Sequence, residues 1–283
     1  MEYILEAEGL NKTYHHSKAL NDFSIHIPKG SIYGFVGENG AGKTTFIRIV
    51  CGLQAPTSGD YRLYGVKSSD KAIDHMQQRI GAVVESPAVY TDMTAENNLK
   101  HQYHVIGMPS YDGIKELLEL VGLSDTGKKK VKNFSLGMRQ RLGIAMALAG
   151  NPDFLILDEP TNGLDPKGII EIRELILRLN REKQITVLIS SHNLDELSRI
   201  ATHYGFIADG HMVRELTAET LEKNSRKCMV LTVTDTEALA RALDFMNLEY
   251  DIISDTVVNV YGEIPVSELS LILAEDGCKI LSM

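Results

Sequence analysis

The strongest chemical pattern in the chain is a glycine-rich loop over residues 37–44, which reads Gly-Glu-Asn-Gly-Ala-Gly-Lys-Thr. Glycines at these places let backbone N–H groups turn inward and approach phosphate oxygens closely. A short apolar run precedes the loop and a helical pattern follows it, so the positive end of a helix also points at the anion. The loop therefore predicts a nucleotide site, with the lysine on the β and γ phosphates and Thr44 on Mg²⁺. The expected nucleotide contacts are Gly37, Asn39, Gly40, Ala41, Gly42, Lys43, Thr44 and Thr45.

A second pattern places two acidic residues directly after an apolar run. Residues 155–157 are Leu-Ile-Leu, and Asp158 and Glu159 follow them. A carboxylate at the end of a buried strand must be neutralised, and Mg²⁺ bound to a nucleotide can do so. We therefore assign Asp158 to the metal and Glu159 to the role of general base for an attacking water. A purely structural role for such an acidic pair is the alternative.

The elements that position these residues follow from apolar periodicity. Uninterrupted apolar runs are typical of strands buried on both faces of a parallel sheet. Here they alternate with helical patterns, which predicts an α/β fold. Between residues 85 and 150 strand signals are scarce, which indicates a helical insertion. The expected strands cover residues 31–36, 154–157 and 185–189, and the expected helices cover 43–50, 95–104, 111–121, 135–149, 168–180 and 194–202.

A different unit is expected from about Ser225. A strand pattern over 229–233 precedes a helix that Thr236 can cap, with Leu239, Leu243 and Met246 on one face. Two short strands, a helix near Pro265 and a last strand follow. This βαββαβ order resembles a small ferredoxin-like module. We expect a first domain over residues 1–222, with its helical part at about 86–150, and an accessory module over 226–283.

Composition narrows the classes of protein. The chain has 38 acidic and 29 basic residues, a formal net charge of -9, which argues against nucleic acid as its main partner. Its three cysteines give no metal or disulfide pattern. No apolar stretch approaches the ~20 residues of a membrane helix, and the first residues lack a signal sequence. We expect a cytoplasmic protein whose membrane role, if any, comes through a partner.

Together these motifs resemble the ATPases of ABC transporters, over about residues 3–220. The most specific match is residues 134–141, Phe-Ser-Leu-Gly-Met-Arg-Gln-Arg, which resembles the family signature LSGGQxQR. Ser135 and Gly137 match, whereas Leu136 and Met138 depart from it. In the family this helix start holds the γ-phosphate of ATP bound to the opposite protomer, and an ordinary helix cap is the alternative.

Three further residues fall where the family places functional groups. Asp165 resembles the dimer-contacting residue of the D-loop, although it could simply cap a helix. His192 resembles the switch histidine that contacts the γ-phosphate. Tyr14 lies where the family stacks an aromatic ring on adenine.

Glu85 stands where the family usually has a glutamine near Mg²⁺ and water. The resemblance implies a metal contact for its carboxylate, and a solvent-exposed neutral substitution is the alternative. With the Ser-Leu-Gly-Met signature, Glu85 makes the chain similar to the bacitracin- and lantibiotic-resistance branch of ABC exporters.

The resemblance implies a subunit that binds ATP and Mg²⁺, hydrolyses ATP as a homodimer, and powers a separate transmembrane permease. It would lie on the inner face of the cell membrane and drive export of a peptide antibiotic or a similar amphipathic molecule. One alternative is a soluble ABC-type ATPase acting on ribosomes or DNA. A nucleotide-dependent regulatory module without turnover is another.

Overall fold

The computed structural model describes residues 2–15, 17–224, 228–262 and 264–282. The chain forms two compact units, Met1–Ala218 and Glu219–Met283. Helix α8 (Ala218–Asn224) lies at the boundary. The two units are described separately below.

The first unit is built on a six-stranded sheet in the order β10-β9-β3-β8-β7-β6. Strands β9, β3, β8, β7 and β6 run parallel, and β10 is an antiparallel edge strand. Every residue of β3, β7 and β8 is buried, which confirms that these apolar runs form central strands. The strand bounds are Ile32–Val36 (β3), Ile80–Val83 (β6), Phe154–Asp158 (β7), Thr186–Ser191 (β8), His203–Ala208 (β9) and His211–Thr217 (β10).

One face of this sheet is covered by helix α1 (Lys43–Val50) and by a second, antiparallel sheet. Phe23, Phe35 and Phe46 join the two sheets and the helix, with ring centroids 4.9 to 5.8 Å apart. This aromatic contact fixes α1, and with it the loop before α1, against the central strands. The second sheet has the order β2-β1-β4-β5, with bounds Tyr3–Tyr14 (β1), Ser17–Pro28 (β2), Ser58–Leu63 (β4) and Val66–Lys67 (β5).

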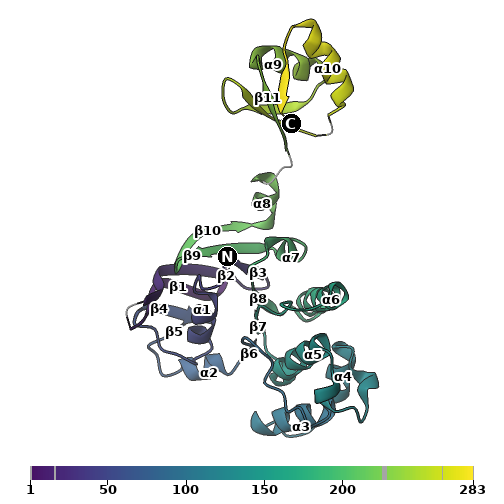
Figure 1. The fold of residues 1–283 in the computed structure, drawn as a ribbon. Helices are drawn as coiled ribbons and strands as arrows, with labels where there is room; N and C mark the ends of the chain where they lie inside the picture. Colours follow the sequence, from purple (N-terminus) through teal and green to yellow (C-terminus); the bar gives the residue numbers. More distant parts are fainter. Residues whose placement is uncertain (1, 16, 225–227, 263, 283) are drawn as a thin grey trace. The chain divides into compact units, whose positions relative to one another are not determined.

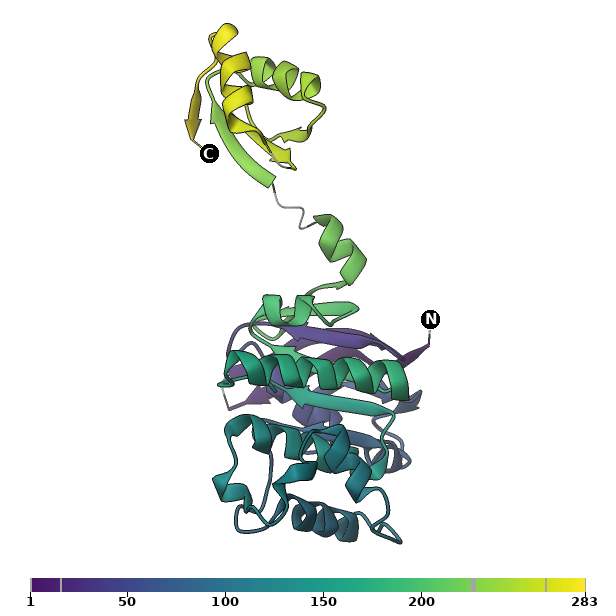
Figure 2. The ribbon, with the colours of Figure 1, turned by 90° about the vertical axis from the view of Figure 1, so that its right-hand side faces the viewer.

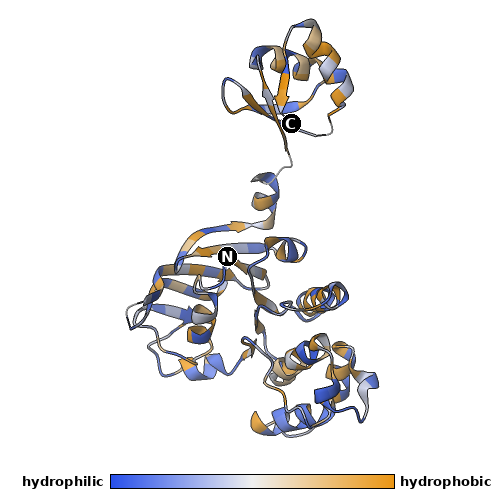
Figure 3. Ribbon diagram, viewed as in Figure 1, coloured by the Kyte–Doolittle hydropathy of each residue, from blue (hydrophilic) through white to orange (hydrophobic). Residues whose placement is uncertain are grey.

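Helices α6 (Pro166–Lys183) and α7 (Leu194–Ser198) lie on the opposite face (Figures 1 and 2). Both apolar and polar residues occur along α6 (Figure 3). Its buried residues Ile172, Leu175, Ile176 and Leu179 recur at helical spacing, as expected for a helix with one face on a core. The helix is longer than the predicted residues 168–180, because Asp165 caps its start.

The expected helical insertion is present beside β6. It contains α3 (Ala95–Val105), α4 (Ile114–Leu120) and α5 (Leu136–Ala147). Helix α4 begins later than predicted because Gly113, with φ 89°, precedes its first turn. The first unit also contains a short helix before β6, α2 (Ile73–Gln77). It has 3₁₀ turns at Ser124–Thr126, Val131–Asn133 and Leu148–Gly150.

The second unit has the element order that the sequence suggests. Its antiparallel sheet has the strand order β12-β13-β11-β14. Leu239 and Leu243 are buried in its core, and Met246 packs against them. The elements are β11 (Cys228–Val233), α9 (Thr236–Phe245), β12 (Glu249–Ile252), β13 (Val257–Tyr261), α10 (Val266–Glu275) and β14 (Ile280–Ser282).

One expectation about this unit is wrong, and another is not tested. The cap of α9 is Asp235 and not Thr236, because the Asp235 carboxylate accepts the backbone N–H groups of Glu237 and Ala238 at 2.9 and 3.1 Å. Ser225, where we expected the unit to begin, lies outside the described residues.

Within the described part of the chain, no helix is both long and apolar enough to cross a bilayer.

Candidate nucleotide site

The site is assembled by three neighbouring parallel strands that end at the same edge of the sheet. Val36, the last residue of β3, pairs with Ser191 of β8, and Asp158 of β7 pairs with Ser190. The loop after β3 and the acidic pair after β7 therefore lie beside the segment after β8. In open α/β sheets, ligands bind at this carboxyl edge.

The glycine-rich loop wraps around the ammonium group of Lys43. The lysine Nζ donates to the carbonyl oxygens of Gly37 at 2.5 Å and Glu38 at 3.1 Å, and the side chain is only 5% exposed. Gly42 has φ 111°, and a Cβ there would lie 2.5 Å from the Ala19 carbonyl oxygen. A side chain at position 42 would therefore deform the loop.

The other expected loop residues lie around this centre. Asn39 and Gly40 are exposed at the rim, and Ala41 is buried. Thr44 and Thr45 are half-buried in the first turn of α1. Backbone N–H groups of the loop and of this helix start are the groups that cradle phosphate in loops of this type.

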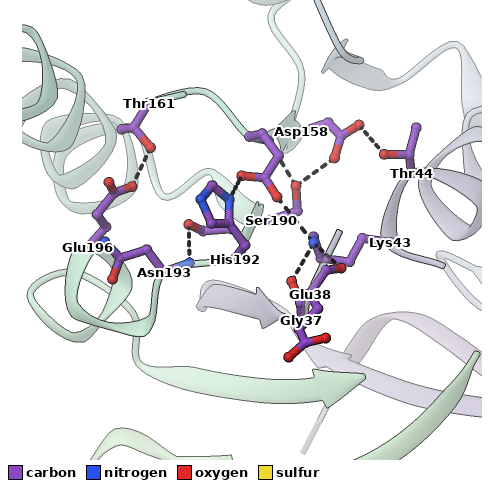
Figure 4. A network of polar contacts seen from close by, with 12 residues as sticks. Gly37, Glu38, Lys43, Thr44, Asp158, Thr161, Ser190, His192, Asn193 and Glu196 are labelled. Atoms are coloured by element: carbon purple, nitrogen blue, oxygen red, sulfur yellow. Dashed lines mark hydrogen bonds and ion pairs between the residues drawn. The ribbon is translucent and has the colours of Figure 1, made fainter. Parts of the chain in front are cut away.

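Asp158 is held by two hydroxyl groups. Thr44 Oγ1 donates to one carboxylate oxygen at 2.8 Å, and Ser190 Oγ donates to the other at 2.6 Å. The same serine oxygen accepts the backbone N–H of Glu159 at 2.9 Å. Figure 4 shows Ser190 between Asp158 and the segment that carries His192. This network orients the carboxylate of a residue that is 1% exposed.

Glu159 lies between two basic side chains. One carboxylate oxygen is 3.2 Å from Lys43 Nζ, and the other is 2.9 Å from His192 Nδ1. Since a carboxylate only accepts hydrogen bonds, Nδ1 carries the proton in this contact. The backbone of Glu159 has φ 49°, a left-handed conformation that is uncommon outside glycine. The unusual backbone is held by the Ser190 contact and turns the side chain toward the phosphate loop.

The oxygen donors of this site fit Mg²⁺. Thr44 and Asp158 offer a hydroxyl and a carboxylate that already touch each other. The described part of the chain has no group of three or more His, Cys, Asp or Glu side chains that could enclose a metal. Mg²⁺ usually takes one or two protein oxygens and completes its shell with phosphate and water, so this small donor set suits it.

The charge of Asp158 also reaches the far end of α1. Burial raises the pKa of the Cys51 thiol to about 12, and the Asp158 carboxylate adds to the rise. Cys51 is the residue that follows α1.

Ser190 is the functional residue that the sequence reasoning missed. Its hydroxyl bonds to both members of the acidic pair. A signal was present, because Ser190 and Ser191 end an apolar run directly before His192. Polar residues at the end of a strand buried on both faces need partners, and a neighbouring acidic strand end supplies one.

Glu85 is not brought into this network. Its carboxylate pairs with Arg48 in the last turn of α1, at 2.5 Å, and its side chain is 59% exposed. The backbone at Glu85 has φ 62°. The structure thus gives Glu85 an arginine partner and does not place it on Thr44 and Asp158.

Among the described residues, the signature residues do not take part in the contacts that join Lys43, Glu159 and His192. Ser135 Oγ accepts the Met138 N–H at 3.2 Å and caps α5. Ser135 is exposed and Gly137 is half-buried. Asp165, also exposed, caps α6 through the Gly168 N–H at 3.2 Å. Ser135 and Asp165 thus each cap a helix and are still exposed.

Tyr14 ends strand β1 and is 38% exposed. Its hydroxyl group donates to the side-chain carbonyl of Gln54, and the Lys12 ammonium lies 5.2 Å from the ring centroid. An exposed ring of this kind can stack on a planar base.

A separate groove of about 890 Å³ lies beside β6 and is lined by residues of the helical insertion and the end of α1. None of the described side chains that line it is acidic or basic. The lining includes Cys51, Leu53, Ser86, Pro87, Val105, Ile106, Met108 and Met146. Leu53 and Val105 are each 64% exposed, so the groove presents apolar side chains to the outside.

A parallel sheet with a phosphate loop, an acidic strand end and a histidine after the next strand fits an ATP-binding cassette. Comparisons with known proteins agree. The profile described as ABC transporter matches residues 20–162. The bacitracin transport ATP-binding protein BcrA of Bacillus licheniformis is 40% identical over 100% of this chain and 93% of its own length. The lantibiotic transport ATP-binding protein SrtF of Streptococcus pyogenes is 42% identical over 75% of this chain and 90% of its own length.

Solved structures give the same result. A dimeric ATP-binding cassette in a post-hydrolysis state with ADP and phosphate is 26% identical, with a TM-score of 0.68 over 76% of this chain and 98% of that chain. The protein cbiO1 of Clostridium perfringens, part of an ABC transporter complex, is 25% identical, with a TM-score of 0.70 over 87% of this chain and 97% of that one. The chain belongs to the ABC transporter family, and it is an ATPase and the ATP-binding subunit of a transporter.

Proposed function

We propose that this subunit drives a separate transmembrane permease that exports a peptide antibiotic or a similar amphipathic molecule. The observation that carries the ATPase part is the bonded network of Lys43, Asp158, Glu159 and His192 at one sheet edge. The identity to proteins described as bacitracin and lantibiotic transport subunits supports the substrate class.

The proposed chemistry is phosphoryl transfer to water. Lys43 and the loop N–H groups would bind the β and γ phosphates, and Tyr14 would stack on adenine. Glu159 would orient the attacking water, with His192 holding its carboxylate in place. Mg²⁺, held by Thr44 and Asp158, would neutralise charge on the phosphates. Glu85 would join this metal site only after its carboxylate leaves Arg48.

We also propose that two copies of the chain close on ATP. Ser135 caps α5 and is exposed, and Gly137 lies in the first turn of this helix, a helix start suited to an anion. A partner's γ-phosphate would satisfy them, and Asp165 would lie in the contact. The dimeric cassette bound to ADP and phosphate supports this arrangement.

The permease would dock in the groove beside β6. The groove has no charged lining residue and exposes apolar side chains, so it fits a short apolar helix of a membrane partner. Residues Ser86 and Pro87 line it directly after Glu85, which would link docking to the nucleotide site. The chain would then lie in the cytoplasm, on the inner face of the membrane.

We propose domain boundaries at 1–222 and 226–283, with the second domain a ferredoxin-like accessory module. The βαββαβ order and an antiparallel sheet with the order β12-β13-β11-β14 support this assignment. None of the residues proposed for ATP chemistry lies in it.

Co-purification tests the transport proposal. The chain is expressed with a multi-span permease encoded beside it, and the complex is isolated in detergent. We expect the two to co-purify and bacitracin or a lantibiotic to stimulate ATP hydrolysis by the complex. Replacing Val105 in the groove with Asp should abolish co-purification, whereas Val213→Asp, at an equally exposed valine on β10, should not. Full co-purification of the Val105 variant would contradict docking in the groove, and a complex indifferent to both peptides would contradict the substrate class.

A further inference from the structure

Leu136 departs from the family signature, and the nucleotide chemistry leaves it without a role. It is the first residue of α5, directly after the Ser135 cap, and its side chain is 47% exposed. The signature position usually holds glycine, so a large apolar group here changes what the helix start can touch.

The Leu136 side chain lies over Gly163, in the turn that follows Glu159. A Cβ built on Gly163 would lie 3.3 Å from Leu136 Cδ2. Gly163 has φ 74°, a conformation that glycine adopts without strain. The leucine methyl group therefore packs directly on the backbone of this turn.

A reciprocal contact lies beside it. A Cβ built on Gly137 would lie 3.8 Å from Leu164 Cδ2. Leu164 also packs over Gly168 of α6, since a Cβ there would lie 3.4 Å from Leu164 Cβ. Leu136 thus covers Gly163, and Leu164 covers Gly137. These packed contacts couple the start of α5 to the turn after Glu159.

Backbone hydrogen bonds tie the turn to the main chain of Glu159. The N–H of Asn162 donates to the Glu159 carbonyl at 3.1 Å, and the N–H of Leu164 donates to the Thr161 carbonyl at 3.1 Å. Thr161 Oγ1 donates to Glu196 of α7 at 2.5 Å. Because Gly163 is only four residues after Glu159 and the turn between them is hydrogen-bonded, a shift of Gly163 would also move Glu159.

We infer that Leu136 is a positioning residue that couples the signature helix start to Glu159 of the same chain. This inference rests on the proposed function, in which Ser135 and Gly137 hold ATP of the opposite site. Binding of that phosphate would fix the start of α5, and the Leu136–Gly163 contact would then fix the turn after Glu159. ATP bound at one site would thereby fix the position of Glu159, the general base of the other site.

The inference predicts a loss of turnover without a loss of binding. Leu136→Ala removes the methyl groups above Gly163 and leaves Ser135 and the backbone of Gly137 in place. We expect kcat to fall roughly 3-fold to 10-fold, less than the ~100-fold that a 1 Å misplacement can cause. The ATP concentration for half-maximal rate should stay within about 2-fold. Leu136→Met, which keeps most of the side-chain volume, should retain most of the turnover.

The second readout is ATP-driven dimerisation, measured in a Glu159→Gln background by analytical ultracentrifugation. We expect Leu136→Ala to leave the dimer constant unchanged, because the variant acts on positioning. Leu271→Ala, at a 71% exposed leucine of α10, is the matched control and should change neither turnover nor dimerisation.

These measurements distinguish a positioning role of Leu136 from a contact in the dimer interface. If Leu136→Ala weakens dimerisation in proportion to turnover, Leu136 is an interface contact and the inference is wrong. An unchanged kcat would also overturn it. If the wild-type chain itself neither hydrolyses ATP nor dimerises with it, the proposed function fails first, and the inference fails with it.

Discussion

Glu159 and His192 meet through a single contact, 2.9 Å between a carboxylate oxygen and Nδ1. The other carboxylate oxygen faces Lys43 at 3.2 Å. The candidate base is thus held by one group from the segment after β8 and one from the phosphate loop. ATP would compete for the lysine, since phosphate oxygens and Glu159 approach the same ammonium group.

Ser190→Ala should impair catalysis and stability together. The variant removes a donor to Asp158 and an acceptor for the Glu159 N–H in a buried place. Leaving such groups unsatisfied costs about 1–3 kcal/mol. We expect a lower melting temperature and a kcat reduced by about 10-fold or more, measured by calorimetry and steady-state assays. Ser198→Ala, at an exposed serine of α7, is the control, and equal effects of the two variants would contradict the role of Ser190.

Glu85 and Arg48 should affect the Mg²⁺ requirement in opposite directions. Arg48→Met frees the Glu85 carboxylate from its ion pair, so less Mg²⁺ should be needed at fixed ATP. Glu85→Gln removes the carboxylate, so more should be needed. Exposed ion pairs are worth only about 0–1 kcal/mol, and we expect shifts of 2-fold to 3-fold in a Mg²⁺ titration of ATPase rate. If neither variant shifts the titration, Glu85 has no metal role.

Cys51 should resist alkylation in the folded protein. Because burial and Asp158 raise its pKa from 9.0 to about 12, the thiol stays protonated between these values while the unfolded thiol ionises. Because only the unfolded thiol ionises in this range, the free energy of unfolding falls as pH rises from 9.0 to about 12, and the contribution of the buried thiol to stability is complete only below pH 9. At pH 9 we expect iodoacetamide to modify Cys51 at least ~100-fold more slowly in the native chain than in urea. Mass spectrometry gives the rates, with the half-buried Cys228 as internal reference. Equal native and unfolded rates for Cys51 would contradict its assignment as a buried thiol.

A chain ending at Lys223 should fold and hydrolyse ATP. Every residue proposed for the nucleotide site lies before Ala218, in the first compact unit. We expect the truncated chain to keep its ATPase rate within about 2-fold and to unfold in one cooperative transition. Loss of ATP binding in a folded truncated chain would show that the second unit contributes to the site.

The sequence predicted the central strands and the loop because their signals are local. The apolar runs before Gly37 and Asp158 are long enough to mark strands buried on both faces. The ends of elements were predicted less well, since a single residue decides them. Gly113 delays α4, and Asp235 rather than Thr236 caps α9.

The partners of site residues depend on contacts between distant segments. Arg48 and Glu85 are 37 residues apart, and periodicity gives no sign that the end of α1 meets the segment after β6. Ser190 reaches Asp158 across two strands whose pairing register had to be known. The type of site could be predicted from motifs, but its hydrogen-bond network needed the fold.

ATP-driven dimerisation of Glu159→Gln tests the central claim most directly. General acid–base catalysis contributes about 10²–10⁴-fold, so this variant should bind ATP, lose at least ~100-fold in turnover, and sediment as a dimer when ATP and Mg²⁺ are added. Ser135→Arg in the same background, which blocks the signature face, should bind ATP and remain monomeric. A Glu159→Gln chain that turns ATP over at the wild-type rate, or that stays monomeric at saturating ATP and high protein concentration, would contradict the account.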